Sequence, residues 1–261
     1  MSKHLDLTVR ATKDAGVAIH SAYQQKLDIE TKGDGSPLTI ADQRAHMAML
    51  ARLVASEIAV ASEEGDDLHL EASRYWLVDP LDGTKYFLAG NDEFTVNIAL
   101  VVDQAPVLGV VFAPALDEFY TVECGLGEWK EKAGIRSQFL AVEKSPRCRM
   151  AVSRFHDHLD VDSFASANRF DVRVAVGSAL KYGHLATEAV DLFPRLVGSL
   201  EWDTAEGQSV LEAAGGQVLD WHTVKPLRYG KIGRRNPRLL SFRASYAFTE
   251  FTLRRYESEL L

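Results

Sequence analysis

A rigid, doubly acidic turn follows an apolar run in the first half of this 261-residue chain. The run from Tyr75 to Val78 is typical of a buried strand, and it leads directly into Asp79-Pro80-Leu81-Asp82-Gly83-Thr84. The Pro80 ring fixes φ and stiffens the turn, whereas Gly83 lets the backbone approach a ligand closely. Two carboxylates on such a turn offer the hard oxygen ligands that Mg²⁺ prefers. A plain strand–turn–helix junction with Asp82 as the helix cap fits the turn equally well.

Two further acidic segments accompany this turn. Upstream, a short apolar run ends in Glu63-Glu64, and downstream Asp203 and Glu206 introduce a helix-like run rich in small residues. At this spacing Asp203 and Glu206 also form a good helix capping box, as do Thr39 and Asp42. Each segment alone therefore has a purely structural explanation. Their order and separation along one chain favour a shared functional site.

The set resembles the inositol monophosphatase superfamily, whose members are lithium-sensitive, magnesium-dependent phosphomonoesterases. Their sequences carry Glu-Glu, then Asp-Pro-(Ile/Leu)-Asp-Gly-Thr, then Trp-Asp in the second half. The likeness is closer to the CysQ-type 3'(2'),5'-bisphosphate nucleotidases, because Lys85 follows the Thr of the motif. Further matching segments are Glu93 to Leu100, Gly177 to Lys181, Leu192 to Arg195 and Glu201 to Ala205. The resemblance covers almost the whole chain, from the first helix to the segment near Leu240.

Two positions depart from the family pattern. Tyr86 follows Thr-Lys where the family commonly has Glu, and Phe155 stands where it often has Ser. Neither position is a presumed metal ligand. Both lie near the presumed substrate, so the departures concern substrate preference more than chemistry.

The resemblance implies an α/β (α+β) fold, the layered αβαβα sandwich of the inositol monophosphatase and fructose-1,6-bisphosphatase type. The sequence pattern agrees, with helical periodicity over the first 25 residues and over about 42–56, and a hairpin turn at Asp103-Gln104 between strand-like runs. From about residue 145, short β-like runs alternate with helix-like runs over 178–187, 203–214 and 245–257. We therefore expect an N-terminal α+β subdomain over 1–145, with an antiparallel sheet and most metal ligands. A C-terminal α/β subdomain over 146–261 should add Asp203 and substrate contacts.

Composition and charge restrict the partners. The chain has 46% hydrophobic and 25% charged residues, as in an ordinary globular protein. A net charge of −8 argues against a nucleic-acid polymer or an anionic membrane as main partner. It does not exclude one small phosphorylated substrate, because bound Mg²⁺ makes a carboxylate site locally cationic. A monomer and a homodimer are both compatible with the sequence.

The sequence favours a cytoplasmic enzyme. Cys124 and Cys148 are its two cysteines, and neither has metal-ligand spacing or belongs to a disulfide framework. The amino terminus lacks the apolar core of a signal peptide, and no apolar stretch approaches the ~20 residues of a membrane span. Peripheral contact with the inner face of the cell membrane stays open as an alternative.

By the resemblance, the chain hydrolyses adenosine 3',5'-bisphosphate (PAP) to AMP and phosphate, in sulfate assimilation and nucleotide recycling. Two or three Mg²⁺ ions per site are implied. The metal ligands and catalytic groups carried over from the family are Glu63, Asp79, the Leu81 carbonyl, Asp82 and Asp203, together with Thr84 and Asp42. In this scheme Thr84, hydrogen-bonded to Asp42, orients the attacking water and accepts its proton. Glu63 is carried over both as a metal ligand and as a catalytic group.

The implied substrate contacts come from both halves of the chain: the backbone N–H groups of Gly83 and Thr84, then Ser153, His156, Ser178, Lys181 and Arg195. Lys181 and Arg195 are suited to a second phosphate, which an inositol monophosphate would lack. From the sequence alone, Lys181 fits a surface lysine equally well.

Three alternatives remain at this stage. The first is an inositol monophosphatase with the same metals, and the second is a non-catalytic nucleotide or metal sensor on the same scaffold. The third concerns other clusters: His156-Asp157-His158 as a metal pair, and Arg234, Arg235 and Arg238 as a basic patch. Retention of every presumed ligand and of Thr84 argues against the sensor.

Overall fold

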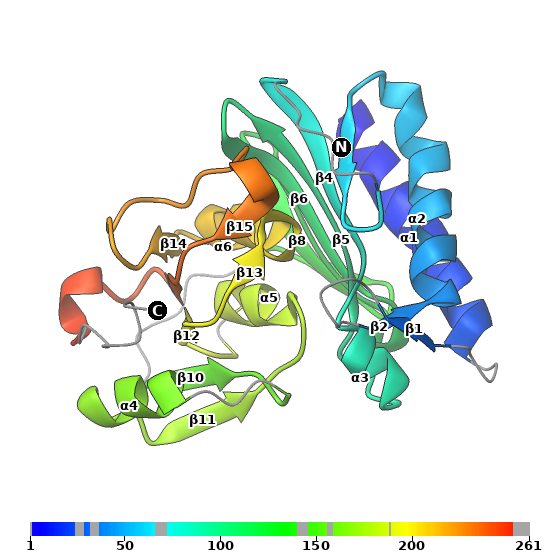
Figure 1. Cartoon of the computed structure of the whole chain (residues 1–261). Helices are drawn as coiled ribbons and strands as arrows, with labels where there is room; N and C mark the ends of the chain where they lie inside the picture. The colour runs from blue at the N-terminus through cyan, green and yellow to red at the C-terminus, as the bar shows by residue number, and fades with distance from the viewer. Residues whose placement is uncertain are drawn as a thin grey trace.

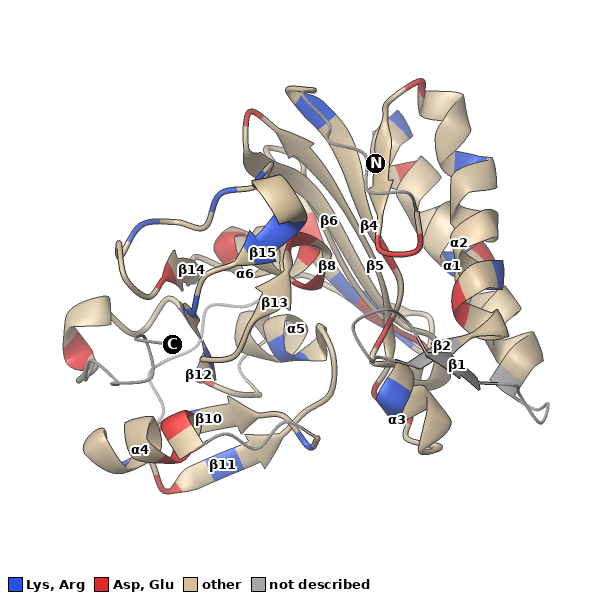
Figure 2. Ribbon diagram, in the orientation of Figure 1, with Lys and Arg blue, Asp and Glu red and all other residues tan. Residues whose placement is uncertain are grey.

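Layers of helix and sheet alternate as αβαβα in the computed structural model, which describes residues 2–23, 29–31, 37–65, 72–139, 146–155, 159–187 and 189–252 (Figure 1). The expected sandwich is thereby confirmed. Within the described part of the chain, none of the helices combines the length and apolar character that a membrane span requires. Lys and Arg positions are interspersed with Asp and Glu over both halves (Figure 2).

The first sheet has seven strands in the order β3-β4-β5-β6-β7-β8-β9. β3 and β4 are parallel, and every later neighbour is antiparallel. The strands are β3 (Val60–Ser62), β4 (Arg74–Asp82), β5 (Thr95–Val102), β6 (Ala105–Ala113), β7 (Glu118–Glu123), β8 (Gly127–Lys132) and β9 (Ile135–Ser137). A small antiparallel ladder of β1 (Ile29–Thr31) and β2 (Pro37–Thr39) precedes it.

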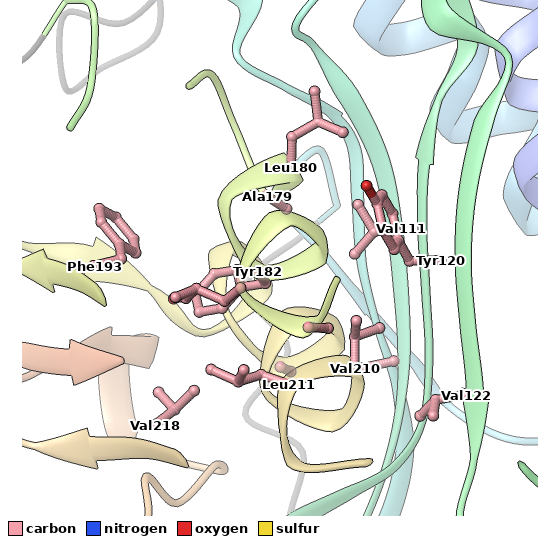
Figure 3. Close-up of a cluster of buried hydrophobic side chains, with 14 of the residues drawn as sticks. Val111, Tyr120, Val122, Ala179, Leu180, Tyr182, Phe193, Val210, Leu211 and Val218 are labelled. Carbon is pink, nitrogen blue, oxygen red and sulfur yellow. The ribbon is translucent and has the colours of Figure 1, made fainter. Parts of the chain in front are cut away.

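Successive side chains of this sheet point to opposite faces, and both faces are buried. Trp76 and Val78 of β4 pack with the outer helices α1 (Lys3–Tyr23) and α2 (Ile40–Leu53). Their neighbours Tyr75 and Leu77 belong to a second core cluster with the inner helices α5 (Leu180–Ala186) and α6 (Ala205–Ala213), because successive side chains of a strand point to opposite faces. Figure 3 shows this second cluster, with α5 and α6 lying between the two sheets.

The second sheet has five strands in the order β11-β10-β12-β16-β14. They are β10 (Arg149–Val152), β11 (Val172–Ala175), β12 (Leu192–Arg195), β14 (Gln217–Asp220) and β16 (Leu239–Phe242). Phe164 of the outermost helix α4 (Leu159–Ala167) packs into the core cluster on one face of this sheet. A short ladder of β13 (Ser199–Leu200) and β15 (Arg235–Asn236) lies beside it, nearer the first sheet (Figure 1).

Most sequence-predicted elements are confirmed, with shifted ends. α2 begins at Ile40 because Thr39 caps it, and the Asp103-Gln104 hairpin turn is present, with both residues at positive φ (48° and 66°). The helix expected over 245–257 is wrong where the structure describes it, since 245–252 holds only a 3-10 turn, Phe248–Glu250. A helix directly after the acidic turn, as in the strand–turn–helix interpretation, is present as α3 (Thr84–Leu88), whereas the helix α4 was not predicted. The division near residue 145 lies in a segment outside the described residues and stays a prediction.

Candidate active site

A pocket of about 280 Å³ lies where β4 ends, between the two halves of the chain. It brings together Glu63 and Asp82 of the first half with Lys181, Arg195 and Asp203 of the second. Its lining consists of Glu63, Asp82, Gly83, Thr84, Lys85, Tyr86, Ser153, Ser178, Lys181, Tyr182, Phe193, Arg195, Leu200, Asp203 and Thr204. A smaller cavity of about 170 Å³ adjoins it, because Ser153, Phe193 and Arg195 line both.

The acidic turn is held in place by both halves. Leu81 N donates to Asp79 Oδ1 at 3.1 Å, and Ala179 N, at the start of α5, donates to Asp82 Oδ2 at 2.7 Å. Gly83 has φ of 88°, and a Cβ there would clash with Ser178 Oγ, so glycine is required for a steric reason as well. Gly83, not Asp82, is the N-cap of α3, so the interpretation of Asp82 as a helix cap is wrong.

Asp42 serves the helix and the pocket with different oxygens. Its Oδ2 accepts hydrogen bonds from Thr39 N and Thr39 Oγ1, both at 2.7 Å, which completes the predicted capping box of α2. Its Oδ1 accepts a hydrogen bond from Thr84 Oγ1 at 3.1 Å. Asp42 is only 1% exposed, so the cap fixes the carboxylate that receives the Thr84 hydroxyl.

Four carboxylates, which we call the acidic cluster, act on one another: Glu63, Asp79, Asp82 and Asp203. Burial raises the pKa of Asp79 well above its ordinary value, and the charges of the other three raise it further. Burial also raises the pKa of Asp82, opposed by the charges of Lys181 and Arg195. The cluster therefore concentrates negative charge in a region of low dielectric constant, which a divalent cation would neutralise.

The donor chemistry and charge of this cluster fit Mg²⁺. Nearby, the fully buried Asn97 pairs with Asp79 across β4 and β5, and its side chain hydrogen-bonds to Asp82, which opposes the effect of burial on the pKa of that carboxyl. Even so, within the described ranges no three His, Cys, Asp or Glu side chains form a closed ligand group. Asp203, for example, accepts a hydrogen bond from Leu200 N at 2.9 Å and lies 3.7 Å from Arg195 Nη2.

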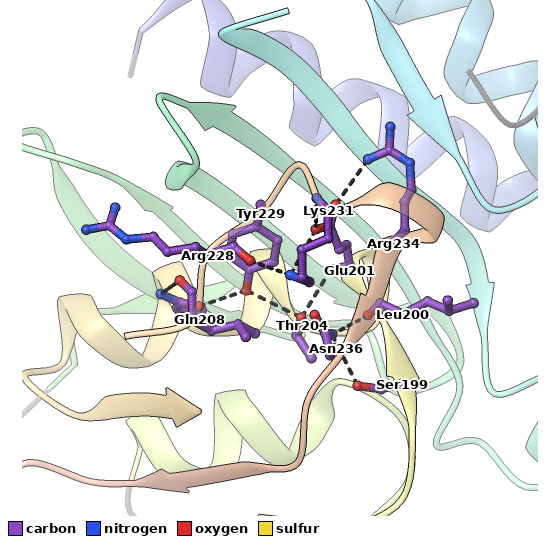
Figure 4. A network of polar contacts seen from close by, with 11 residues as sticks. Ser199, Leu200, Glu201, Thr204, Gln208, Arg228, Tyr229, Lys231, Arg234 and Asn236 are labelled. Atoms are coloured by element: carbon purple, nitrogen blue, oxygen red, sulfur yellow. Dashed lines mark hydrogen bonds and ion pairs between the residues drawn. The ribbon is translucent and has the colours of Figure 1, made fainter. Parts of the chain in front are cut away.

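Asp203 is positioned by a buried polar network rather than by capping α6. It ends the 3-10 helix η3 (Glu201–Asp203), and Thr204 is the N-cap of α6, so the predicted Asp203–Glu206 capping box is wrong. The fully buried Glu201 accepts a hydrogen bond from Lys231 N at 2.9 Å and pairs with Arg234 at 3.1 Å, as Figure 4 shows.

The predicted basic patch is likewise structural. Arg234 is 6% exposed and belongs to this network, while Arg238 pairs with Asp160 at 3.0 Å. These arginines therefore stabilise the fold around η3 and α4, and the patch offers no continuous surface for a nucleic acid.

Lys181 is buried at 2% exposure, so its interpretation as a surface lysine is wrong. Its Nζ donates to Ser178 O at 3.1 Å and lies 5.1 Å from the centre of the Phe193 ring. Burial and, next, the charge of Arg195 lower the pKa of Lys181 to about 7. Arg195 Nε is buried and has no hydrogen-bond partner in the part of the chain that the structure describes. Both side chains have donors to spare for an anionic ligand, whose charge would favour the protonated form of Lys181.

Ser153 and Ser178 also line the pocket, whereas His156 and the rest of the predicted His156–His158 metal pair lie outside the described residues. Ser178 Oγ donates to Asp82 O at 2.9 Å, and Ser153 Oγ lies 3.1 Å from the Tyr86 hydroxyl. These contacts tie the second half of the chain to the acidic turn.

Tyr86 and Phe155, the two departures from the family pattern, contact each other. Their rings meet edge to face, with centroids 4.7 Å apart, and Phe155 is 45% exposed at the surface. The Tyr86 hydroxyl also accepts a hydrogen bond from Arg154 N at 3.2 Å, and Arg154 pairs with Glu93 at 2.8 Å. Sequence reasoning missed this pairing, although two departures in otherwise matching segments were a signal for it.

Comparison with known proteins gives one consistent result. The profile of the inositol monophosphatase family matches residues 1–241. The 3'(2'),5'-bisphosphate nucleotidase CysQ of Escherichia coli K12 is 38% identical over 232 residues, which span 86% of this chain and 93% of that protein. The crystal structure of CysQ from Bacteroides thetaiotaomicron has a TM-score of 0.83 at 31% identity and covers 92% of this chain and 97% of its own. The chain therefore belongs to the inositol monophosphatase family.

Proposed function

We propose that this protein is a Mg²⁺-dependent phosphomonoesterase that hydrolyses adenosine 3',5'-bisphosphate to AMP and phosphate. One observation carries the proposal: a single pocket joins the acidic cluster and the Thr84–Asp42 pair to the basic side chains of Lys181 and Arg195. The phosphate that is cleaved needs the acidic cluster and the Thr84–Asp42 pair, and the phosphate that is only bound needs Lys181 and Arg195. The CysQ nucleotidases to which the chain is similar support this choice of substrate.

Mg²⁺ would be held by the acidic cluster and the Leu81 carbonyl, where it supplies charge neutralisation and an acidified water. Thr84 orients the attacking water, because its hydroxyl hydrogen is directed to Asp42 Oδ1 and its lone pairs remain available as acceptors. As the water attacks phosphorus, its proton passes to Thr84 Oγ1 while the Thr84 proton moves to Asp42 Oδ1; the P–O3' bond breaks, and the leaving 3'-oxygen takes up a proton from a solvent water. We assign Glu63, which lines the pocket, both as a metal ligand and as a catalytic group.

The uncleaved 5'-phosphate is assigned to Lys181 and Arg195. Lys181 Nζ uses one of its three hydrogens on Ser178 O, and Arg195 Nε is unpartnered within the described residues, so both retain donors. The backbone N–H groups of Gly83 and Thr84, with Ser153 and Ser178, are assigned to the remaining polar contacts. His156 stays a predicted contact from the sequence.

Phosphate release over a panel of nucleotide bisphosphates and sugar phosphates, with Mg²⁺ and with a chelator, tests the proposal. Adenosine 3',5'-bisphosphate in Mg²⁺ should be the best substrate. A clear preference for inositol monophosphate would support the rival phosphatase, and absence of turnover with tight nucleotide binding would support the sensor. A cytoplasmic location fits the free cysteines Cys124 and Cys148 and stays a prediction, as does the oligomeric state.

A further inference from the structure

Glu206 is a buried carboxylate that the mechanism above does not use. It lies in the first turn of α6 and is 1% exposed. Its Oε1 is buried and has no hydrogen-bond partner among the described residues. Backbone N–H groups of Glu206 and Gly207 hydrogen-bond to this carboxylate, but an oxygen left without a partner is still costly to bury, so its position calls for a ligand or a neutral form.

The backbone of Glu206 rests on the same sheet face as Asp79. A Cβ added to Gly109 of β6 would lie 2.6 Å from Glu206 O and 3.1 Å from its Cα, so α6 touches the sheet there. Gly109 is in register with Ala99, and Ala99 with Leu77. Two residues further along each strand, on the same face of the sheet, Asp79 of β4 is in register with Asn97 of β5, and Asn97 with Val111 of β6.

Charge effects agree with this placement. The carboxylate of Glu206 is among the groups that raise the pKa of Asp79. Burial raises the pKa of Glu206 itself, hydrogen bonds from the backbone N–H groups of Glu206 and Gly207 oppose that shift, and the charges of Asp82 and Asp203 add to it. Glu206 therefore shares one region of low dielectric constant with the acidic cluster.

We propose that Glu206 is an additional carboxylate ligand of the divalent-cation site formed by the acidic cluster. This inference rests on the proposed function, because it adds a ligand to the cation site that the function requires. A fifth carboxylate increases the negative charge of the site, so it strengthens the binding of divalent cations. The competing explanation is a neutral carboxylic acid that fills space beneath α6.

Calorimetric titration with Mg²⁺ of the full chain tests this assignment. Glu206→Gln keeps the shape of the side chain and removes its charge, and Glu206→Met replaces it with an apolar chain of similar length. Both should raise the Kd for Mg²⁺ by roughly ten- to hundred-fold, the range found when groups that support a metal site are removed. Both should also reduce the rise in Tm that Mg²⁺ causes, and in chelator both should be at least as stable as the wild type.

Two further variants distinguish the outcomes. Glu212→Gln removes an exposed carboxylate of the same helix and should bind Mg²⁺ like the wild type, whereas Asp82→Asn should bind it weakly. If Asp82→Asn weakens binding and both Glu206 variants do not, Glu206 is a neutral space-filling acid and the inference is overturned while the proposed function stands. A wild-type protein that binds no Mg²⁺ would overturn both.

Discussion

Replacement of Lys181 should separate the two phosphates of the substrate. The side chain is 2% exposed, and its Nζ lies over the Phe193 ring, so Lys181→Ala would leave a cavity as well as remove a charge. Lys181→Met keeps the apolar stem and removes only the ammonium group. The methionine variant therefore isolates the electrostatic contact, and the alanine variant adds a stability cost to it.

The expected loss follows from the strength of one charged hydrogen bond. Such a bond contributes about 1.5–3 kcal/mol. At about 1.4 kcal/mol for each factor of ten, kcat/KM for adenosine 3',5'-bisphosphate should fall roughly ten- to hundred-fold in both variants. Adenosine 2'-monophosphate and inositol monophosphate lack the second phosphate, so their slow hydrolysis should barely change.

Phosphate release measured for all three substrates is the assay, with Lys225→Met as the control. Lys225 is exposed and is not among the residues that line the pocket, so its loss should leave the ratio between the substrates unchanged. An equal loss for every substrate in Lys181→Met would show that Lys181 serves the reaction centre or the fold. No loss for any substrate would refute its assignment to the second phosphate.

Four other outcomes are expected. Activity should vanish in chelator and return with Mg²⁺, with little turnover in Ca²⁺, whose looser geometry suits the reaction poorly; full activity in chelator would contradict the cation site. Asp82→Asn should lower kcat by several orders of magnitude while circular dichroism shows a folded protein, whereas unfolding would favour a structural turn. Gly83→Ala should lower both Tm and kcat, because φ is 88° and the new Cβ clashes with Ser178; wild-type values would refute this steric argument. Burial alone would raise the pKa of Glu118, yet hydrogen bonds from the β8 lysines and Tyr120 lower it to about 2. Because the unfolded chain takes up this proton first, near its ordinary pKa of 4.5, the stabilisation is complete above that pH and is lost toward pH 2. Denaturant unfolding of Glu118→Gln should therefore show a deficit of about 2 kcal/mol at neutral pH that shrinks in acid.

The parts of the site that are local in sequence could be predicted. The strand leading to Asp79, the cap formed by Thr39 and Asp42 and the turn at Gly83 all depend on residues within a few positions of one another. The αβαβα layering followed from the family resemblance together with the change in pattern near residue 145. A helix after the turn was expected, but the extent of α3 could not be predicted, because five residues carry no helical periodicity.

Contacts between the two halves could not be predicted. Asp82 is fixed by the N–H group of Ala179, and Lys181 is buried because α5 packs between the sheets. Sequence patterns report which residues are apolar, but not which distant backbone donor reaches a given carboxylate. For the same reason Glu206 resembled a capping residue, although its burial comes from the contact of α6 with β6.

Product analysis tests the central claim most directly. Wild-type enzyme is given adenosine 3',5'-bisphosphate and Mg²⁺ in water enriched in heavy oxygen, and the products are separated and weighed by mass spectrometry. Water attack on the 3'-phosphorus, with the 5'-phosphate held by Lys181 and Arg195, predicts 5'-AMP without label and phosphate carrying one labelled oxygen. Release of adenosine 3'-phosphate, label in the nucleotide, or no phosphate at all would contradict the account.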